Sequence, residues 1–206
     1  MESVTIVLGN LETIKQEELI GDIIGVDYGA KLLAQQGIEM DLSIGDFDSV
    51  STNDMDMIKQ CSKKMIVLQK EKDESDFEAA LQYTQNYQKV YVLGGLGGRF
   101  DHQYVNIQLV KKDNRLILMD DQNQIEIKDV GTHQLIRNKF QYISFFSLEE
   151  AMISLIGFKY PLDHYLLSSN DLFALSNEIM DEQASLIVQS GKVFMIQSND
   201  KQKKEE

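Results

Sequence analysis

The chain has 206 residues with one proline, and 43% of its residues are hydrophobic, enough to bury one sizeable core or two small ones. Its 20 lysines and arginines against 33 aspartates and glutamates give a formal net charge of −13, which repels nucleic acid and anionic membranes, so neither is expected as a partner. The single cysteine, Cys61, excludes an internal disulfide framework and a cysteine-based zinc site. No apolar run approaches membrane-spanning length, and we therefore expect a cytoplasmic protein.

The first part of the chain alternates strand-like and helix-like segments, as βαβ units do. Apolar runs typical of buried strands lie at residues 4–8, 23–26, 42–44, 65–68 and 90–93. Helices are expected at 30–36, which Gly37 ends, from Ser75, where Ser75 and Glu78 match a capping box, and at 103–111. This pattern predicts an α/β domain with a mostly parallel sheet over residues 1–121.

The pattern changes after a further apolar run at residues 116–119. Residues 124–128 alternate polar and apolar side chains, as in a strand with one wet face. More strands are expected at 142–146, 152–156 and 165–167, and the segments on either side of Ser190-Gly191 predict a hairpin with a two-residue turn. We therefore expect an all-β sandwich domain over residues 122–199, followed by a charged tail at 200–206.

A glycine-rich stretch follows the predicted strand at 90–93. It reads Gly94-Gly95-Leu96-Gly97-Gly98-Arg99 and matches neither the P-loop nor the dinucleotide fingerprint. Glycines after a strand permit positive φ and close approach of the backbone, the next helix offers N–H groups to an anion, and Arg99 suits phosphate. Asp101 lies near the expected helix start, where it could be an N-cap. Spacing alone leaves a phosphate site and a structural turn equally open.

Asp46 and Asp48 follow the predicted strand at 42–44. In extended backbone, positions i and i+2 point the same way, so the two carboxylates would lie together. Like charges in one place favour a cation, and oxygen-only ligands suit Mg²⁺. The alternative is a surface turn capped by Asp48 or Ser49.

A third polar cluster spans residues 70–76 and leads into the helix expected from Ser75. By itself it is typical of a solvated, charged loop in which Asp76 complements the helix dipole. However, all three clusters follow predicted parallel strands, and the carboxyl ends of such strands share one edge of the sheet, where ligands bind. Their convergence predicts a site for a magnesium-bound nucleotide.

Taken in order, the motifs resemble those of the thiamine pyrophosphokinases. The resemblance covers nearly the whole chain and rests on residues 25–30, 45–49, 72–76, 94–102 with Asn106, 157–162 and 175–178. The chain departs from the family pattern at Tyr28, where the family usually has a second glycine, and at Ser75, where it usually has threonine. The resemblance implies transfer of the pyrophosphoryl group of ATP to the hydroxyl of thiamine, giving thiamine diphosphate and AMP.

The resemblance also implies an N-terminal α/β domain, a C-terminal β-sandwich and a homodimer. Each active site would lie between the α/β domain of one subunit and the β domain of the other. The catalytic residues implied are Asp48, Asp73 and Asp76, and those holding Mg²⁺ are Asp46, Asp48 and Asp76. Asp73 is the candidate acceptor of the thiamine hydroxyl proton, with Asp48 or Asp76 as alternatives.

The remaining expected site residues bind the two substrates. Lys72 and Arg99 are assigned to phosphate, Asp27 and Asp101 to the nucleotide or a metal-bound water, and His102 to substrate or to a structural role. Ser176 and Asn177 would contact thiamine across the dimer, although both are also common turn formers.

Two other functions fit parts of the pattern. A magnesium-dependent nucleotide phosphohydrolase would need the acidic clusters but would consume ATP without thiamine. A non-catalytic nucleotide- or thiamine-sensing module could keep the glycines and dispense with the acidic pairs, so the presence of those pairs argues against it.

Overall fold

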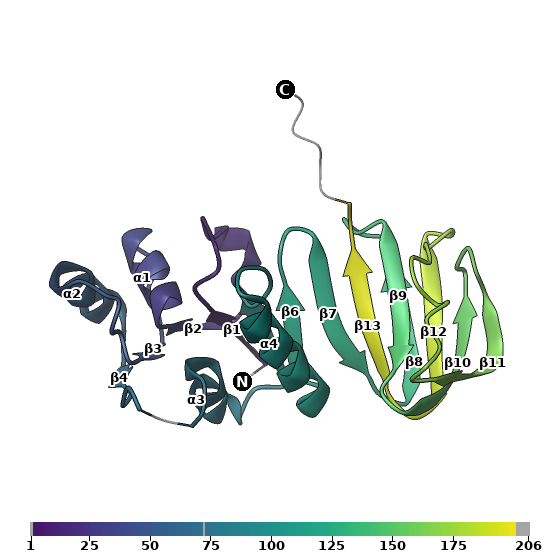
Figure 1. Ribbon diagram of the computed structural model, residues 1–206. Helices are drawn as coiled ribbons and strands as arrows, with labels where there is room; N and C mark the ends of the chain where they lie inside the picture. The colour runs from purple at the N-terminus through teal and green to yellow at the C-terminus, as the bar shows by residue number, and fades with distance from the viewer. Residues whose placement is uncertain (1, 72, 201–206) are drawn as a thin grey trace. The chain divides into compact units, whose positions relative to one another are not determined.

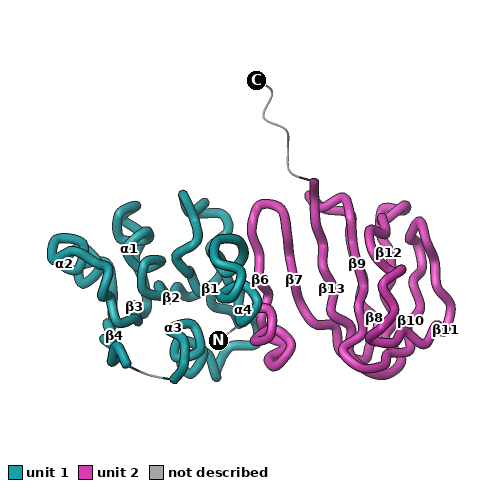
Figure 2. Tube along the Cα trace, in the orientation of Figure 1, with its two compact units in different colours: residues 1–106 teal, residues 107–206 magenta. Residues whose placement is uncertain are grey.

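The computed structural model describes residues 2–71 and 73–200, which form two compact units that divide between Asn106 and Ile107 (Figures 1 and 2). The boundary between the two domains that the sequence predicts after residue 121 stays a prediction. In the described part of the chain, no helix is both long and apolar enough to cross a membrane.

The unit before Ile107 is built on five parallel strands. They are β1 (Ser3–Val7), β2 (Asp22–Val26), β3 (Leu42–Gly45), β4 (Met65–Val67) and β5 (Lys89–Leu93). They lie in the order β4-β3-β2-β1-β5, and every neighbouring pair is parallel. The pairing confirms the predicted parallel sheet. Strands β1 and β3 are buried almost throughout, as is typical of strands in a parallel sheet that is covered on both faces.

Helices cover both faces of this sheet. They are α1 (Tyr28–Gln35), α2 (Thr52–Cys61), α3 (Asp76–Leu81) and α4 (Phe100–Lys112), with 3₁₀ turns η1 (Gln16–Glu18) and η2 (Gln82–Thr84). Figure 1 shows α1 and α2 on one face and α3 on the other. Crossovers are right-handed, so the helix changes face when the chain reverses its direction across the sheet between β4 and β5.

One predicted helix start is confirmed and the others differ from the structure. At α3 both bonds of the capping box form, since Glu78 N–H donates to Ser75 Oγ at 3.2 Å and Ser75 N–H donates to Glu78 Oε2 at 3.1 Å. Helices α1 and α4 begin two and three residues before the expected starts at residues 30 and 103. Helix α2 was not predicted, although Ser51 caps it by accepting a hydrogen bond from Asp54 N–H.

The strand order places a switch point at β1. The chain runs from β1 through β2 and β3 to β4, then returns to β5 on the other side of β1. At such a point the loops that follow the two central strands separate and leave a crevice at the carboxyl ends. The loops after β1 and β5 therefore form the natural binding edge of this sheet.

The unit from Ile107 onward is antiparallel. Its strands are β6 (Leu116–Met119), β7 (Asn123–Lys128), β8 (Gly131–Ile136), β9 (Tyr142–Ser147), β10 (Glu150–Ile156), β11 (Leu162–Ser168), β12 (Gln183–Ser190) and β13 (Val193–Ser198). One layer has the order β6-β7-β13-β9 and the other β11-β10-β12-β8. A shared core that includes Phe145, Ile153, Leu186 and Met195 joins the layers into the predicted all-β unit.

The hairpin predicted around Ser190-Gly191 is wrong. Strand β12 pairs with β10 and β8, whereas β13 pairs with β7 and β9, so the chain changes layer between them. Alternation of polar and apolar residues identifies a strand with one buried face, but it does not specify which strand lies beside it.

Gly191 allows this change of layer. Its φ is +77°, and a Cβ there would lie 2.1 Å from the carbonyl oxygen of Glu150. We expect Gly191→Ala to lower the free energy of unfolding by about 3 kcal/mol or more, since backbone strain and a backbone clash add. Chemical denaturation measures this. The matched control is Gly37→Ala, because Gly37 has φ +69° but open space, and only about 1 kcal/mol is expected there. Equal costs at the two positions would contradict the role of the clash.

Candidate active site

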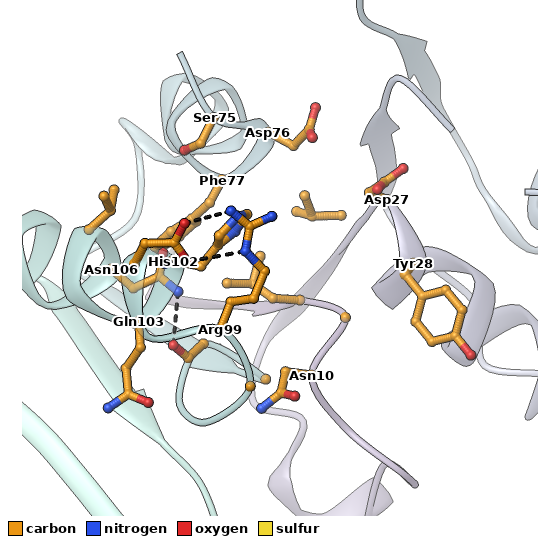
Figure 3. Close-up of a pocket in the computed structure, with 18 of the residues that line it drawn as sticks. Asn10, Asp27, Tyr28, Ser75, Asp76, Phe77, Arg99, His102, Gln103 and Asn106 are labelled. Carbon is orange, nitrogen blue, oxygen red and sulfur yellow. Dashed lines mark hydrogen bonds and ion pairs between the residues drawn. The ribbon is translucent and has the colours of Figure 1, made fainter. Parts of the chain in front are cut away.

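A cavity of about 690 Å³ lies at the carboxyl edge of the parallel sheet (Figure 3). Its walls come from the segments that follow β1, β2, β3 and β5, and from the starts of α3 and α4. All of its lining residues belong to the unit before Ile107. The cavity therefore occupies the edge at which the switch point and the strand ends predict ligand binding.

The glycine loop, residues 94–98, forms one wall of the cavity together with Asn10. Gly94 has φ +72°, and a Cβ there would lie 2.4 Å from the carbonyl oxygen of Leu8, so the loops after β1 and β5 pack backbone to backbone. Gly97 and Gly98 are also left-handed, at φ +75° and +67°. Only glycine adopts three such conformations with little strain, and it also lets a ligand approach the backbone closely.

Arg99 and Asp101 form an ion pair at the start of α4. Arg99 Nε lies 3.1 Å from Asp101 Oδ1, and Nη2 lies 2.5 Å from Oδ2. Asp101 is the second residue of α4, and its carboxylate accepts the adjacent His102 N–H, so the alternative that it is the N-cap is wrong. The hydrogen bond from Arg99 lowers the pKa of Asp101 to about 2. The pair is exposed and charged at neutral pH, which leaves the guanidinium accessible to phosphate.

We expect a carbon-detected NMR titration to give Asp101 a pKa of about 2 and to show that Arg99→Ala raises it toward the ordinary range. Because the folded pKa is the lower one, the stabilisation is complete above the unfolded pKa and is lost as pH falls through about 2. The pKa of Asp113, which pairs with Arg115, should not respond to the change at residue 99. A pKa of Asp101 that is the same with and without Arg99 would contradict the pairing.

Asp27, Asp46 and Asp76 are among the acidic residues that line the same cavity. Burial raises the pKa of Asp27, and the negative charges of Asp76 and Asp46 raise it further. Asp27 stands at the end of β2 with an unusual φ of +48°, and its Oδ1 accepts the N–H of Phe47 at 3.1 Å. The loops after β2 and β3 are thus tied together, and the tie brings acidic groups close to one another.

The expected extended geometry of Asp46 and Asp48 is wrong. Strand β3 ends at Gly45, and Phe47 has φ +53°, so the chain turns between the two aspartates. Asp46 Oδ1 accepts the N–H of Asp48, as in an Asx turn, while the exposed Asp48 carboxylate pairs with Lys70 at 2.9 Å. Asp46 therefore faces the cavity, and Asp48 lies outside its lining.

The acidic groups fit a magnesium ion that is completed by its other ligands. Within the described residues, no group of three histidine, cysteine, aspartate or glutamate side chains is placed to hold a metal ion alone. Mg²⁺ typically takes only one or two carboxylates and completes its shell with waters and substrate phosphates. Asp27 has a raised pKa beside two further carboxylates, and a divalent cation would relieve the repulsion among them.

Of the other site residues expected in the first unit, only some line the cavity. His102 lines the cavity. Asp73 is exposed and lies outside the lining, and Lys72 lies outside the described residues. His133 contacts the carbonyl oxygen of Asp129 and His164 contacts Asp163, both in the second unit, and neither histidine lines the cavity.

Ser176 and Asn177 lie in the second unit, between β11 and β12. Ser176 has φ +54°, and its N–H donates to Ser144 Oγ. Asn177 is 3% exposed, and its amide both accepts the N–H of Tyr160 at 3.0 Å and donates to the carbonyl oxygen of Tyr160 at 2.8 Å. The Asn177 side chain thus fixes the local backbone, and Ser176 is the more accessible of the two.

Several cavity residues were not predicted from the sequence. They include Gly9 and Asn10 after β1, Phe77 in α3 and Gln103 in α4. The segment after β1 could have been found, since it follows the first predicted strand as the acidic pair follows the third. Tyr28, at which the chain departs from the family pattern, lies on the cavity wall with Lys31 Nζ 5.3 Å from its ring centroid.

Comparison with known families gives two matches along the chain. Residues 6–119 match the model described as "Thiamin pyrophosphokinase, catalytic domain". Residues 132–193 match "Thiamin pyrophosphokinase, vitamin B1 binding domain". The first match alone spans more than half of the chain and contains every residue of the cavity wall.

Individual proteins agree with these matches. The thiamine pyrophosphokinase of Bacillus subtilis (strain 168) is 33% identical over 186 residues, covering 86% of this chain and 87% of its own. The crystal structure of the thiamine pyrophosphokinase from Bacillus subtilis superposes with a TM-score of 0.87 at 28% identity, covering 97% of this chain and all of that one. The corresponding structure from Geobacillus thermodenitrificans has a TM-score of 0.83 at 27% identity, covering 97% and 99%.

Proposed function

Because the chain belongs to the thiamin pyrophosphokinase family, it transfers the pyrophosphoryl group of ATP to thiamine, and we propose that ATP binds in the cavity of its first unit. The observation that carries the proposal is the meeting of the glycine loop and Arg99 with Asp27, Asp46 and Asp76 around that cavity. An anion-binding loop opposite a group of carboxylates is the arrangement that a magnesium-bound polyphosphate needs.

The domain roles follow from this placement. We propose that residues 1–121 form the catalytic, ATP-binding domain and that residues 122–199 bind thiamine and form the dimer. The matched regions, 6–119 and 132–193, support the division. A cytoplasmic location stays a prediction of the sequence.

Phosphate recognition is assigned to the loop and to two cations. Arg99 offers a planar fork of donors to phosphate oxygens, and the start of α4 adds backbone N–H groups. Lys72 is proposed as the second cation. Asp27, Asp101 and His102 are proposed to orient the nucleotide or its bound waters, since all three line the cavity.

Asp46, Asp48 and Asp76 are proposed to hold Mg²⁺, partly through waters. The ion supplies positive charge beside the phosphate oxygens, where negative charge must be balanced during transfer. Asp46 and Asp76 line the cavity directly. Asp48 would exchange its ion pair with Lys70 for this role, and Lys70, which also lines the cavity, would then be released toward phosphate.

The reaction itself exchanges two bonds at phosphorus. The hydroxyl oxygen of thiamine forms a bond to the β-phosphorus, and the bond from that phosphorus to the α–β bridging oxygen breaks, so AMP leaves. The hydroxyl proton passes to a carboxylate, for which Asp73 is the proposed acceptor and Asp48 or Asp76 are alternatives. Positioning and electrostatics dominate such a transfer, so the protein must chiefly align the hydroxyl with the bond that breaks.

Thiamine is proposed to bind at Ser176 and Asn177 of a second copy of the chain. Exposed apolar side chains on and beside β11, here called the β11 patch, support a dimer: Tyr165, Leu166, Leu172, Phe173 and Leu175. The rings of Tyr165 and Phe173 pack edge to face at 5.2 Å, so strand and loop form one surface. Strand β11 is also the edge of its layer, and exposed apolar edges are typical of interfaces.

We expect the double substitution Leu172→Asp, Phe173→Asp to convert a dimer into monomers, since it places charge in the β11 patch. Size-exclusion chromatography with light scattering measures the mass. The control is Val130→Asp, which alters an apolar residue of similar exposure outside the patch and should leave the dimer intact. A wild-type protein that is monomeric at micromolar concentration, or a double variant that stays dimeric, would contradict the proposal.

Separation of the reaction products by HPLC tests the function. ATP, thiamine and Mg²⁺ should give AMP and thiamine diphosphate in equal amounts, with no AMP when thiamine is omitted. Nucleotide consumption without thiamine would instead favour the phosphohydrolase, and tight binding of both substrates without turnover would favour the sensing module.

A further inference from the structure

Three side-chain amides hold the backbone of the glycine loop, residues 94–98. Asn10 Nδ2 donates to the carbonyl oxygen of Leu96, and Asn106 Nδ2 donates to that of Gly95 at 2.8 Å. Gln103 Oε1 accepts the N–H of Gly97 at 2.8 Å. Figure 3 shows all three amides around the loop. Gln103 and Asn106 belong to α4, whereas Asn10 reaches the loop from the segment that follows β1.

Asn10 also explains why two positions of the loop are glycines. A Cβ on Gly97 would lie 2.7 Å from Asn10 Nδ2, and a Cβ on Gly98 would lie 2.8 Å from Asn10 Oδ1. The amide group of Asn10 therefore occupies the space that a side chain at either residue would need. A side chain at either position would push Asn10 aside and break its bond to Leu96.

The contact has a direct consequence for a bound anion. A carbonyl oxygen carries partial negative charge and repels phosphate, so a phosphate-binding loop must direct its carbonyls away from the ligand and toward hydrogen-bond donors. Asn10 and Asn106 supply donors for the carbonyls of Leu96 and Gly95. With the loop fixed in advance, less free energy is spent on ordering it when ATP binds.

We propose that Asn10 is a positioning residue for the pyrophosphoryl transfer, and that it acts by holding the glycine loop in the conformation that receives the phosphates of ATP. The inference rests on the proposed place of ATP in this cavity. Asn10 itself is exposed and follows β1, so its contribution to the stability of the fold is small.

Two substitutions at this position separate the donor from the size of the side chain. Asn10→Ala removes the amide. Asn10→Asp keeps the shape but replaces the donor with a carboxylate beside the Leu96 carbonyl and the phosphates. We expect kcat/KM for ATP to fall at least about tenfold in the first variant and further in the second. KM for thiamine should change less than about twofold, because the loop does not contact that substrate in this proposal.

A second readout does not depend on activity. Hydrogen exchange of the peptide that contains residues 94–99 should become faster in both variants, while the rest of the chain and the melting temperature stay unchanged. The matched control is Asn53→Ala, which removes an exposed asparagine on α2, away from the cavity, and should change neither kinetics nor exchange of the loop.

A further variant tests the mechanism of the effect. Gly97→Ala should displace Asn10, so the losses in kcat/KM from Gly97→Ala and Asn10→Ala should be less than additive. If wild type gives AMP and thiamine diphosphate but the Asn10 variants match it in kcat/KM and in loop exchange, the inference is wrong and the function stands. If wild type forms no such products, the proposed function fails first, and loop exchange alone then decides whether Asn10 holds the loop.

Discussion

Replacing Asp46 with asparagine is expected to lower kcat/KM for ATP about a hundredfold or more while the fold stays intact. Asp46 lines the cavity, and its charge is among those that raise the pKa of Asp27. The amide oxygen of asparagine can still accept the N–H of Asp48, so the turn after β3 survives. Loss of one carboxylate also relieves repulsion, so the melting temperature should stay constant or rise while turnover is lost.

The measurement is AMP release at saturating thiamine, repeated across a magnesium titration. The variant should need more Mg²⁺ to reach half of its maximal rate, which distinguishes a weakened metal site from a general loss. Asp56→Asn is the control, because Asp56 is an exposed aspartate on α2 whose nearby cation is Lys59. Full activity of the Asp46 variant at low Mg²⁺ would refute the metal role.

Replacing Arg99 with alanine is expected to lower kcat/KM for ATP at least about a hundredfold. The guanidinium is 73% exposed at the cavity, held in orientation by Asp101 and ready to contact phosphate. Arg99→Lys keeps the charge but loses the planar fork, so it should recover only part of the activity. The loss should be in kcat as well as in KM if Arg99 contacts the pyrophosphoryl group as it is transferred.

A matched arginine exists in the same chain. Arg115 contacts Asp113 through Nε at 2.9 Å and Nη2 at 2.6 Å, which is the same two-point contact over the same sequence spacing. Arg115 lies outside the cavity lining, so Arg115→Ala should leave kcat/KM unchanged even if it lowers stability slightly. Equal kinetic losses in the two variants would show that the ion pair matters for folding rather than for phosphate.

The parallel sheet could be predicted because its strands are short, continuous apolar runs separated by polar helices. Buried strands carry that signal without reference to their neighbours. The pairing of β12 and β13 could not be predicted, since each strand alternates correctly and only the three-dimensional packing decides that they lie in different layers. The change of layer requires a residue without a Cβ at position 191, because the backbone of Glu150 packs directly against Gly191. No local sequence pattern shows this contact.

The site was predictable to the extent that it depends on strand ends. Asp27, Asp46, Asp76 and Arg99 all follow strands of one parallel sheet or begin helices beside it, and the structure brings them to one cavity. The left-handed turn at Phe47 was not predictable, and it separates Asp46 from Asp48.

Contacts between distant segments were equally hidden from the sequence. The amide of Asn10 meets Leu96 across 86 positions of the sequence, and spacing within one motif holds no information about it. The sequence order of the motifs identified the family, whereas the contacts that shape the loop required the fold.

A crystal structure with thiamine, Mg²⁺ and a non-hydrolysable ATP analogue tests the account most directly. We predict that the β- and γ-phosphates lie against residues 94–99, that the metal ion lies between them and Asp46 and Asp76, and that the thiamine hydroxyl faces the β-phosphorus. A nucleotide bound outside this cavity, or a triphosphate turned away from the glycine loop, would contradict it.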